Sequence, residues 1–363
     1  MPEPAVSIIV PACRDDANLR RVLDGVDALS PKPAHVVIAD DGSPAAEVGA
    51  LAQARGHASV RVNESPAGPA AARNAAAASL PVHPDHWLLF IDADVVPHPD
   101  TVAELHRAIA AADDNDDDDD SQLVSVFGSY DANPPAPGAA SRYANLRHHH
   151  VHTTNPGPAS TFWAGLGAIR SDAFANAGGF DAARFPRPSI EDIELGMRLH
   201  AAGGRLLIHP PMRGTHLKRW TLSNLWRTEV RDRALPWARL LQQTGSTHRP
   251  LNLNRTAQLS AACAGLHLLC LLAATTCGLA LLAAPAQAGG PTLNAAALLA
   301  AALTLTTGAA LAFLQRGLFA TLFRHSPPWQ WPAHWLLHAL HLTYSAAAFV
   351  WVRLTHRRGA AGA

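Results

Sequence analysis

Residues 5–130 alternate between short apolar runs and segments with helical spacing, which predicts strands and helices in turn. The apolar runs are the expected strands, namely Val6–Val10, His35–Ala39, Ala58–Val62, Trp87–Ile91 and Leu123–Gly128. The segments between them have the spacing of helices, and they are Asn18–Leu29, Glu47–Arg55 and Pro69–Ser79. Alternation of this kind is typical of an α/β domain in which helices cover both faces of a mostly parallel sheet.

The last third of the chain has long apolar segments in place of this alternation. Thr256–Ala284 and Thr292–Leu314 are each long enough to cross a bilayer as one helix. Trp335–Val352 is shorter and contains two histidines, so it is either a third span or a helix at the membrane interface. No Asp or Glu follows Arg255, which indicates that the chain changes solvent near this point.

The charges around the first apolar segment predict how the chain is oriented. Residues 213–255 contain nine Lys or Arg and two acids, an excess that favours the cytoplasmic side of a membrane. We therefore expect a multi-pass protein of a bacterial-type inner membrane, with its N-terminal domain in the cytoplasm. Arg316 and Arg324 fall on the same side if the first two segments form a hairpin, whereas a third crossing places Arg353 outside.

The segment before the first span has a pattern of its own. Ser223–Gln242 spaces apolar residues between arginines, which predicts an amphipathic helix lying on the membrane surface. Three regions are thus expected. They are a folded α/β domain at residues 1–220, a juxtamembrane segment at 221–255, and a membrane region with two or three apolar helices at 256–358.

Composition narrows the classes of partner and site. The 29 basic and 29 acidic residues cancel, so the overall charge does not point to nucleic acid. Three of the four cysteines lie seven residues apart in the first apolar segment, too far apart along a helix for a disulfide, and we expect them to act as small apolar side chains. The acidic run Asp113–Asp120 is expected to be a solvated loop and not a calcium site.

Carboxylates follow two of the predicted strands. Asp41 follows the second strand, and Asp92 and Asp94 follow the fourth. In open α/β sheets, ligands bind beyond the carboxyl ends of the strands. Because next-but-one residues of an extended chain point the same way, Asp92 and Asp94 suit a divalent cation that bridges phosphate oxygens. The alternative is an ordinary turn, where Asp is common.

Five separated motifs favour the first interpretation. They are VSIIVPACRDDANL, IADDGS, GPAAARNAA, FIDADVVP and GGFDAARFPRPSIEDIELGMRLHAAGG, in this order along the chain. Over residues 5–220, this series resembles family-2 glycosyltransferases. The resemblance implies the GT-A fold, a nucleotide-sugar donor and a divalent cation, Mg²⁺ or Mn²⁺. The membrane segments add a lipid-linked or cell-envelope glycan acceptor to that expectation.

The resemblance assigns roles at the nucleotide end of the site. Asp41 is similar to the residue that reads the nucleotide base, with Asp40 before it, and Pro11 would line the same pocket. Cys13 stands where the family often has an aromatic residue, so the stacking contact with the base departs from the family pattern.

The resemblance implies that a second group of residues lies beside the diphosphate of the donor. Gly68, Arg73 and Asn74 resemble the family's glycine-to-Ala-Arg-Asn segment beside the nucleotide. Asp92 and Asp94 match the metal and diphosphate motif, with Asp94 as the more direct metal ligand.

The acceptor end is assigned to an acidic pair. Glu191 and Asp192 resemble the pair that opens the family's acceptor-side helix, with Asp192 as general base, because an acceptor hydroxyl is a poor nucleophile until its proton is removed. Acids at this position also suit a helix start. His216 is a candidate metal ligand, with a surface histidine as the alternative. Trp163 either stacks on a sugar ring or packs in the core.

Two other functions are alternatives. A non-catalytic membrane protein that binds nucleotide sugar would be expected to lack part of the acid set, and that set is complete here. A processive polysaccharide synthase is disfavoured because Arg219 and Trp220 lack the glutamine of the Gln-x-x-Arg-Trp motif, and His216 stands in its place.

Overall fold

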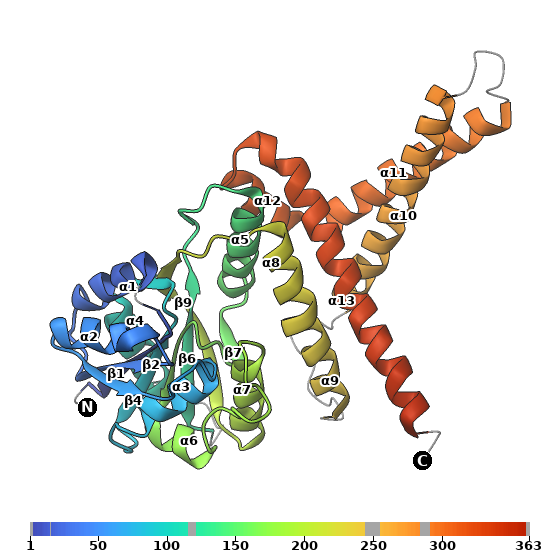
Figure 1. Ribbon diagram of the computed structural model, residues 1–363. Coiled ribbons are helices and arrows are strands. Elements are labelled where there is room, and N and C mark those ends of the chain that lie inside the picture. Colours follow the sequence, from blue (N-terminus) through green and yellow to red (C-terminus); the bar gives the residue numbers. More distant parts are fainter. Residues whose placement is uncertain (1–2, 15, 115–120, 244–254, 284–290, 361–363) are drawn as a thin grey trace. The chain divides into compact units, whose positions relative to one another are not determined.

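The computed structural model describes residues 3–14, 16–114, 121–243, 255–283 and 291–360 of the 363-residue chain (Figure 1). The chain divides into two compact units, residues 1–220 and residues 221–363. The loop predicted for the acidic run was wrong at Asp113 and Asp114, which end helix α4 (Thr101–Asp114), and residues 115–120 lie outside the described residues.

Within the described residues, the first unit is built on a nine-stranded mixed sheet with the order β3-β2-β1-β4-β8-β6-β9-β5, and β7 pairs with β9. The strands are β1 (Ala5–Ala12), β2 (His35–Asp40), β3 (Ala58–Arg61), β4 (His86–Ile91), β5 (Val95–Pro97), β6 (Leu123–Tyr130), β7 (Gly157–Ala159), β8 (Leu166–Arg170) and β9 (Arg205–His216). β3, β2, β1 and β4 are parallel, and β8 is antiparallel to both β4 and β6. All five strands predicted from apolar runs are present, which confirms the α/β fold class.

Helices cover both faces of this sheet (Figure 1). They are α1 (Ala17–Asp27), η1 (Pro44–Ala46), α2 (Glu47–Ala54), α3 (Pro69–Ala77), α4 (Thr101–Asp114), α5 (Ala139–Thr153), α6 (Ser171–Asn176) and α7 (Glu191–Ala201). Ile8 and Val10 of β1 belong to a buried cluster with α1, α2 and α4, whereas Ile9 belongs to a second cluster with α3, α6 and α7. Because alternate strand residues point to opposite faces, a sheet buried on both sides needs the unbroken apolar runs seen in the sequence.

The described residues of the second unit form helices joined by short turns. Its elements are α8 (Leu222–Arg227), the π-helical η2 (Thr228–Ala234), α9 (Leu235–Gln243), α10 (Arg255–Ala283), α11 (Pro291–Leu314), α12 (Arg316–Arg324), η3 (Pro328–Gln330) and α13 (Trp331–Ala360). Three stretches of the described chain are long and apolar enough to cross a membrane. They are Arg255–Ala283, Pro291–Leu314 and Pro328–Thr355, with mean hydropathies of 2.1, 2.0 and 1.3. The third stretch, left open by the sequence, is therefore a candidate span by length and composition.

Polar contacts join α13 to other helices of the second unit. Trp335 Nε1 donates to His267 Nε2 on α10 at 3.1 Å, and Tyr344 OH donates to Oε2 of the buried Glu229 on η2 at 3.3 Å. His338 Nε2 lies 3.2 Å from the side-chain oxygen of Gln315. The polar atoms of Trp335, Tyr344 and His338 on α13 thus have protein partners.

Candidate functional site

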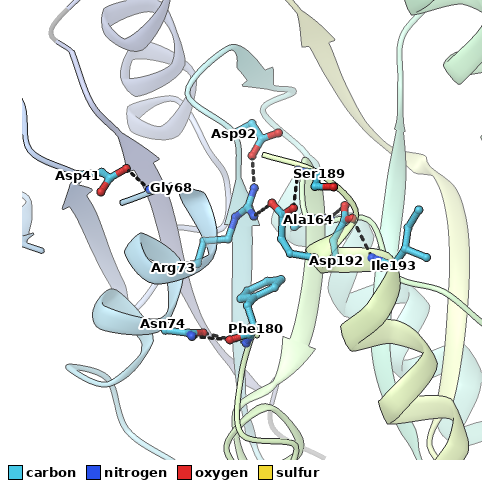
Figure 2. Close-up of polar contacts among 11 residues, drawn as sticks. Asp41, Gly68, Arg73, Asn74, Asp92, Ala164, Phe180, Ser189, Asp192 and Ile193 are labelled. Atoms are coloured by element: carbon cyan, nitrogen blue, oxygen red, sulfur yellow. Dashed lines mark hydrogen bonds and ion pairs between the residues drawn. The ribbon is translucent and has the colours of Figure 1, made fainter. Parts of the chain in front are cut away.

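Two aspartates organise the turn after β2. Asp40 is buried, and its Oδ1 accepts the Ser43 N–H at 2.8 Å while its Oδ2 accepts from Arg61 Nη1 at 3.1 Å. Asp41 accepts the backbone N–H groups of Ala67 and Gly68, at 2.8 Å and 2.9 Å, just before α3. Figure 2 shows the contact with Gly68. Asp40 therefore shapes the turn, while Asp41 holds the loop that leads into the next helix.

The start of α3 is tied to a distant loop. Gly68 has a φ of 97°, and a Cβ there would lie 2.7 Å from the Pro186 carbonyl oxygen, so glycine suits this close approach. Asn74 binds both backbone polar groups of Phe180: its Nδ2 donates to the carbonyl at 2.8 Å, and its Oδ1 accepts the N–H at 2.9 Å. Gly68 and Asn74, both expected beside the nucleotide, thus connect α3 to residues 180–186.

Arg73 lies at the centre of the site (Figure 2). Its side chain is buried, and it donates from Nη2 to Asp92 Oδ1 at 2.6 Å and from Nη1 to Glu191 Oε1 at 3.0 Å. Its guanidinium also lies over the Phe180 ring, 5.3 Å from the centroid. Burial alone would lower the pKa of Arg73, but the charges of Asp92, Glu191 and Asp192 raise it above its ordinary value, so Arg73 is a permanent cation.

Asp92 follows β4 and is turned toward α3. Burial raises the pKa of Asp92, the Arg73 guanidinium opposes this effect, and the charge of Asp94 adds to it. The result is a pKa above the ordinary value. The two carboxylates of the Asp-Ala-Asp motif therefore differ in environment, because one is paired with Arg73 and the other meets β9.

Asp94 is paired with the histidine predicted to help bind metal. His216 Nε2 lies 3.5 Å from Asp94 Oδ2, and His216 Nδ1 is hydrogen-bonded to the side-chain oxygen of Asn145 on α5. Because that oxygen accepts, Nδ1 is the donor in this bond, and Nε2 is the ring nitrogen that faces Asp94. Burial would raise the pKa of Asp94, but the hydrogen bond and charge of His216, together with Lys218, lower it.

This pair fits a divalent cation as part of a larger ligand set. In the part of the chain that the structure describes, no three His, Cys, Asp or Glu side chains converge on one point. Mg²⁺ is commonly held by one or two carboxylates plus substrate phosphates, so a carboxylate and an imidazole leave the remaining positions to a diphosphate and water. Asp92, with Arg73 on one oxygen, has a second oxygen to contribute.

Asp192 is the second residue of α7. Its Oδ2 accepts the Ala164 N–H at 3.1 Å, and its Oδ1 accepts the Ile193 N–H at 2.8 Å (Figure 2). Burial, followed by the charge of Glu191, raises the pKa of Asp192 to about 6, against the opposing effects of Arg73 and the two N–H groups. A carboxylate with this pKa is mostly ionised at neutral pH and is basic enough for proton transfer.

The helix that carries Asp192 is pressed against the loop that binds it. A Cβ at Gly196, one turn along α7, would lie 2.1 Å from the Phe162 nitrogen and 2.5 Å from the Thr161 carbonyl carbon. No side chain fits in this space. The separation between α7 and the Ala164 N–H is therefore set by direct backbone contact.

Trp163 packs in a cluster of rings beside His216. Its ring lies 4.9 Å from that of Tyr130 and 4.5 Å from that of His148 on α5. Tyr130 in turn stacks on His216 with ring centroids 4.2 Å apart. Burial lowers the pKa of the neighbouring His152 to about 4, which keeps that ring neutral. Trp163 is only partly buried, and its contact with a sugar ring stays a prediction.

The predicted residues come together through links that no motif indicated. Pro11 lies beside the Asp41 turn because β1 pairs with β2 at Pro11 and Ala39. Sequence reasoning missed Phe180 under Arg73 and both partners of His216, namely Asn145 and Tyr130. These residues come from separate elements and carry no spacing signal.

Comparisons with known proteins agree with this architecture. The family model described as Glycosyl transferase family 2 matches residues 7–175. The mannosyltransferase PcManGT from Pyrobaculum calidifontis, solved with GDP-Man and Mn²⁺, is similar over 96% of this chain and 88% of its own, with 20% identity and a TM-score of 0.56. This likeness shows a common fold.

Two further solved structures are similar at lower scores. GalNAc-T7, solved with UDP, GalNAc and Mn²⁺, matches over 66% of this chain and 48% of its own, with 18% identity and a TM-score of 0.48. Glucosyl-3-phosphoglycerate synthase from Mycobacterium tuberculosis, solved with Mn²⁺, UDP and its product, matches over 67% of this chain and 80% of its own, with 17% identity and a TM-score of 0.39. No curated protein sequence matches this chain.

Proposed function

We propose that the protein moves a sugar from a nucleotide-sugar donor to an acceptor hydroxyl, inverting the sugar carbon, and the match of the Glycosyl transferase family 2 model to residues 7–175 supports this proposal. One observation carries the proposal. The carboxylate Asp92, expected at the donor, and the acidic pair at the start of α7 belong to one network, because Arg73 binds both Asp92 and Glu191. A donor end and a proton-accepting end are therefore adjacent.

Asp192 is the general base in this proposal. Both of its oxygens are held by backbone N–H groups, and each keeps a second lone pair for the acceptor hydroxyl. It takes the hydroxyl proton as the acceptor oxygen bonds to the sugar carbon. Attack on the face opposite the departing nucleoside diphosphate inverts that carbon. Asp41, Pro11, Asn74 and Gly68 are proposed to line the nucleotide.

A divalent cation, Mg²⁺ or Mn²⁺, is proposed to accompany the donor. Asp94, His216 and the second oxygen of Asp92 would hold it together with the donor diphosphate. When bound, it would neutralise negative charge on the leaving group. PcManGT, which shares the fold, was solved with Mn²⁺ and a nucleotide sugar, and this supports the assignment.

The acceptor is proposed to be a lipid-linked or cell-envelope glycan at the cytoplasmic face of an inner membrane. The three candidate spans support a membrane anchor. Support also comes from the run of helices α8, η2 and α9, where Leu222 and Trp226 are 66% and 54% exposed and the neighbouring Arg227 and Arg231 are exposed as well. An apolar stripe flanked by arginines suits the boundary between headgroups and acyl chains.

The pH dependence of turnover follows from the environment of Asp192. The base acts only when ionised, and its pKa is raised to about 6. We expect kcat/KM to increase with pH through about 6 and to level off above it. Initial rates measured between pH 4.5 and 8.5 in buffers of constant ionic strength check this. A profile that is flat through pH 6 would contradict the assignment of Asp192.

The test of the overall function is a donor screen on the full-length protein in detergent micelles or nanodiscs. We expect a single nucleotide sugar to be consumed, with release of nucleoside diphosphate, only when Mn²⁺ or Mg²⁺ and a bacterial membrane lipid extract are both present. Removal of the cation with EDTA should abolish the release, and fresh Mn²⁺ should restore it. Tight donor binding without release under all conditions would instead favour a non-catalytic sugar-nucleotide-binding protein.

A further inference from the structure

Glu191 and Asp192 are adjacent carboxylates with different surroundings. Glu191 is 5% exposed, and both of its oxygens are occupied: Oε1 accepts from Arg73 Nη1 at 3.0 Å, and Oε2 accepts the Ser189 N–H at 2.8 Å. Asp192 is only partly buried, and its partners are two backbone N–H groups. Geometry therefore separates the pair into a carboxylate that faces the interior and one that faces the site.

The partner of Glu191 is a rigid cation with a second task. The guanidinium of Arg73 is planar, so the angle between its two bonds, one to Glu191 and one to Asp92, is fixed. The Phe180 ring lies against it, 5.3 Å from the guanidinium carbon. One side chain on α3 thus fixes the end of β4 relative to the start of α7.

We infer that Glu191 is a positioning residue, which orients Arg73 toward Asp92 and does not itself accept the acceptor's proton. This inference rests on the proposed function and deepens it, because it divides the acidic pair into a base and a support for the base. A proton acceptor needs an oxygen that a substrate hydroxyl can reach. Glu191 has both oxygens turned to protein donors in the interior.

The negative charge of Glu191 has a second consequence for its neighbour. The charged side chains acting on Asp192 are Glu191 and Arg73, and Glu191 works in the same direction as burial by raising the pKa of Asp192. Removal of that negative charge lowers the pKa of the base.

The experiment compares Glu191→Gln with Glu191→Asp in the full-length protein, using kcat, donor KM and the pH profile as readouts. We expect Glu191→Gln to lower kcat by about ten- to a hundredfold, because Arg73 is displaced by a fraction of an ångström or more. The acid limb of its pH profile, meaning the rise in rate as Asp192 ionises, should shift to a lower pH than in the parent. Glu191→Asp keeps the charge but shortens the side chain, so its kcat should fall while its acid limb stays with the parent.

Glu194→Gln is the matched control. Glu194 is also buried on α7 and binds an arginine, Arg198, at 2.8 Å, but none of its contacts involves Arg73 or Asp92. We expect this variant to shift neither the acid limb nor the donor KM, whatever it does to thermal stability.

Two results would overturn the inference. The first is a Glu191→Gln variant that folds, retains the parent's donor KM and is as inactive as Asp192→Asn, which would make Glu191 the proton acceptor. The second is a Glu191→Gln variant with the parent's kcat and acid limb. Failure of the proposed function has a different signature, because the parent protein then gives no transfer with any donor.

Discussion

Replacement of Asp192 with asparagine is expected to lower kcat by about a thousandfold, the contribution that a general base commonly makes. The amide oxygen can still accept the Ala164 N–H, whereas the amide NH2 cannot accept the Ile193 N–H. The amide has no basic lone pair for the acceptor proton. Donor KM should change little, because Asp192 lies at the acceptor end of the proposed site.

The thermal stability of Asp192→Asn provides a second test of the raised pKa of Asp192. The folded-state pKa of Asp192, about 6, is above its ordinary value of 3.8, so ionisation of this group disfavours the folded state as pH rises through 6. Asparagine removes this effect, and the thermal midpoint at pH 8 should stay level or increase.

The control for Asp192→Asn is Asp172→Asn, which removes an acid at the start of α6 that pairs with Arg170 outside the site. Initial rates with saturating donor measure both variants. If Asp192→Asn transfers sugar as fast as Asp172→Asn, then Asp192 is not the base.

Replacement of Arg73 with methionine is expected to lower the free energy of unfolding by about 3–5 kcal/mol, the range found when one partner of a buried ion pair is removed. The arginine side chain is 5% exposed, and its loss leaves Glu191 and Asp92 without their shared cation. Urea unfolding followed by circular dichroism on residues 1–220, if they fold alone, or thermal unfolding of the full chain, measures the change.

Arg55→Met provides a control with similar distances and different burial. Arg55 lies 2.8 Å and 2.9 Å from two aspartates, but its side chain is 22% exposed and the aspartates are more exposed still. Exposed pairs of this kind contribute about 0–1 kcal/mol. If Arg73→Met and Arg55→Met lowered the free energy of unfolding equally, burial of the Arg73 ion pairs would not increase their contribution to stability. Arg73→Lys, which keeps the charge but not the planar fork, should fall between parent and Arg73→Met.

The strands that position the site were predictable because burial on two faces leaves a strong signal. β1, β2 and β4 are near-continuous apolar runs, and candidate carboxylates stand at the ends of β2 and β4. β5 and β7 were not predicted, because three residues are too few to show a period. β9 was missed for another reason: it contains two consecutive prolines, and its pairing with β6 shifts register between Phe127 and Ser129.

The candidate residues were predictable as a set, but their connections were not. Arg73 and Glu191 are 118 positions apart, and Asn74 and Phe180 are 106 apart, so no local spacing could indicate these bonds. Asn74 was expected beside the nucleotide, and the structure adds a bond to each backbone polar group of Phe180. The third apolar segment could not be assigned from the sequence because its histidines lower its hydropathy. The sequence does not show that His338 meets Gln315 or that His341 meets Tyr344.

The contact at Gly196 limits how this site can diversify over time. Most surface loops of an enzyme accept insertions and new side chains, and new specificities arise there. The seam between α7 and residues 161–164 has no such freedom, because even a methyl group at Gly196 would push the two segments apart. Related proteins can therefore vary the loops that surround the substrates, but the position of Asp192 relative to residues 161–164 stays fixed.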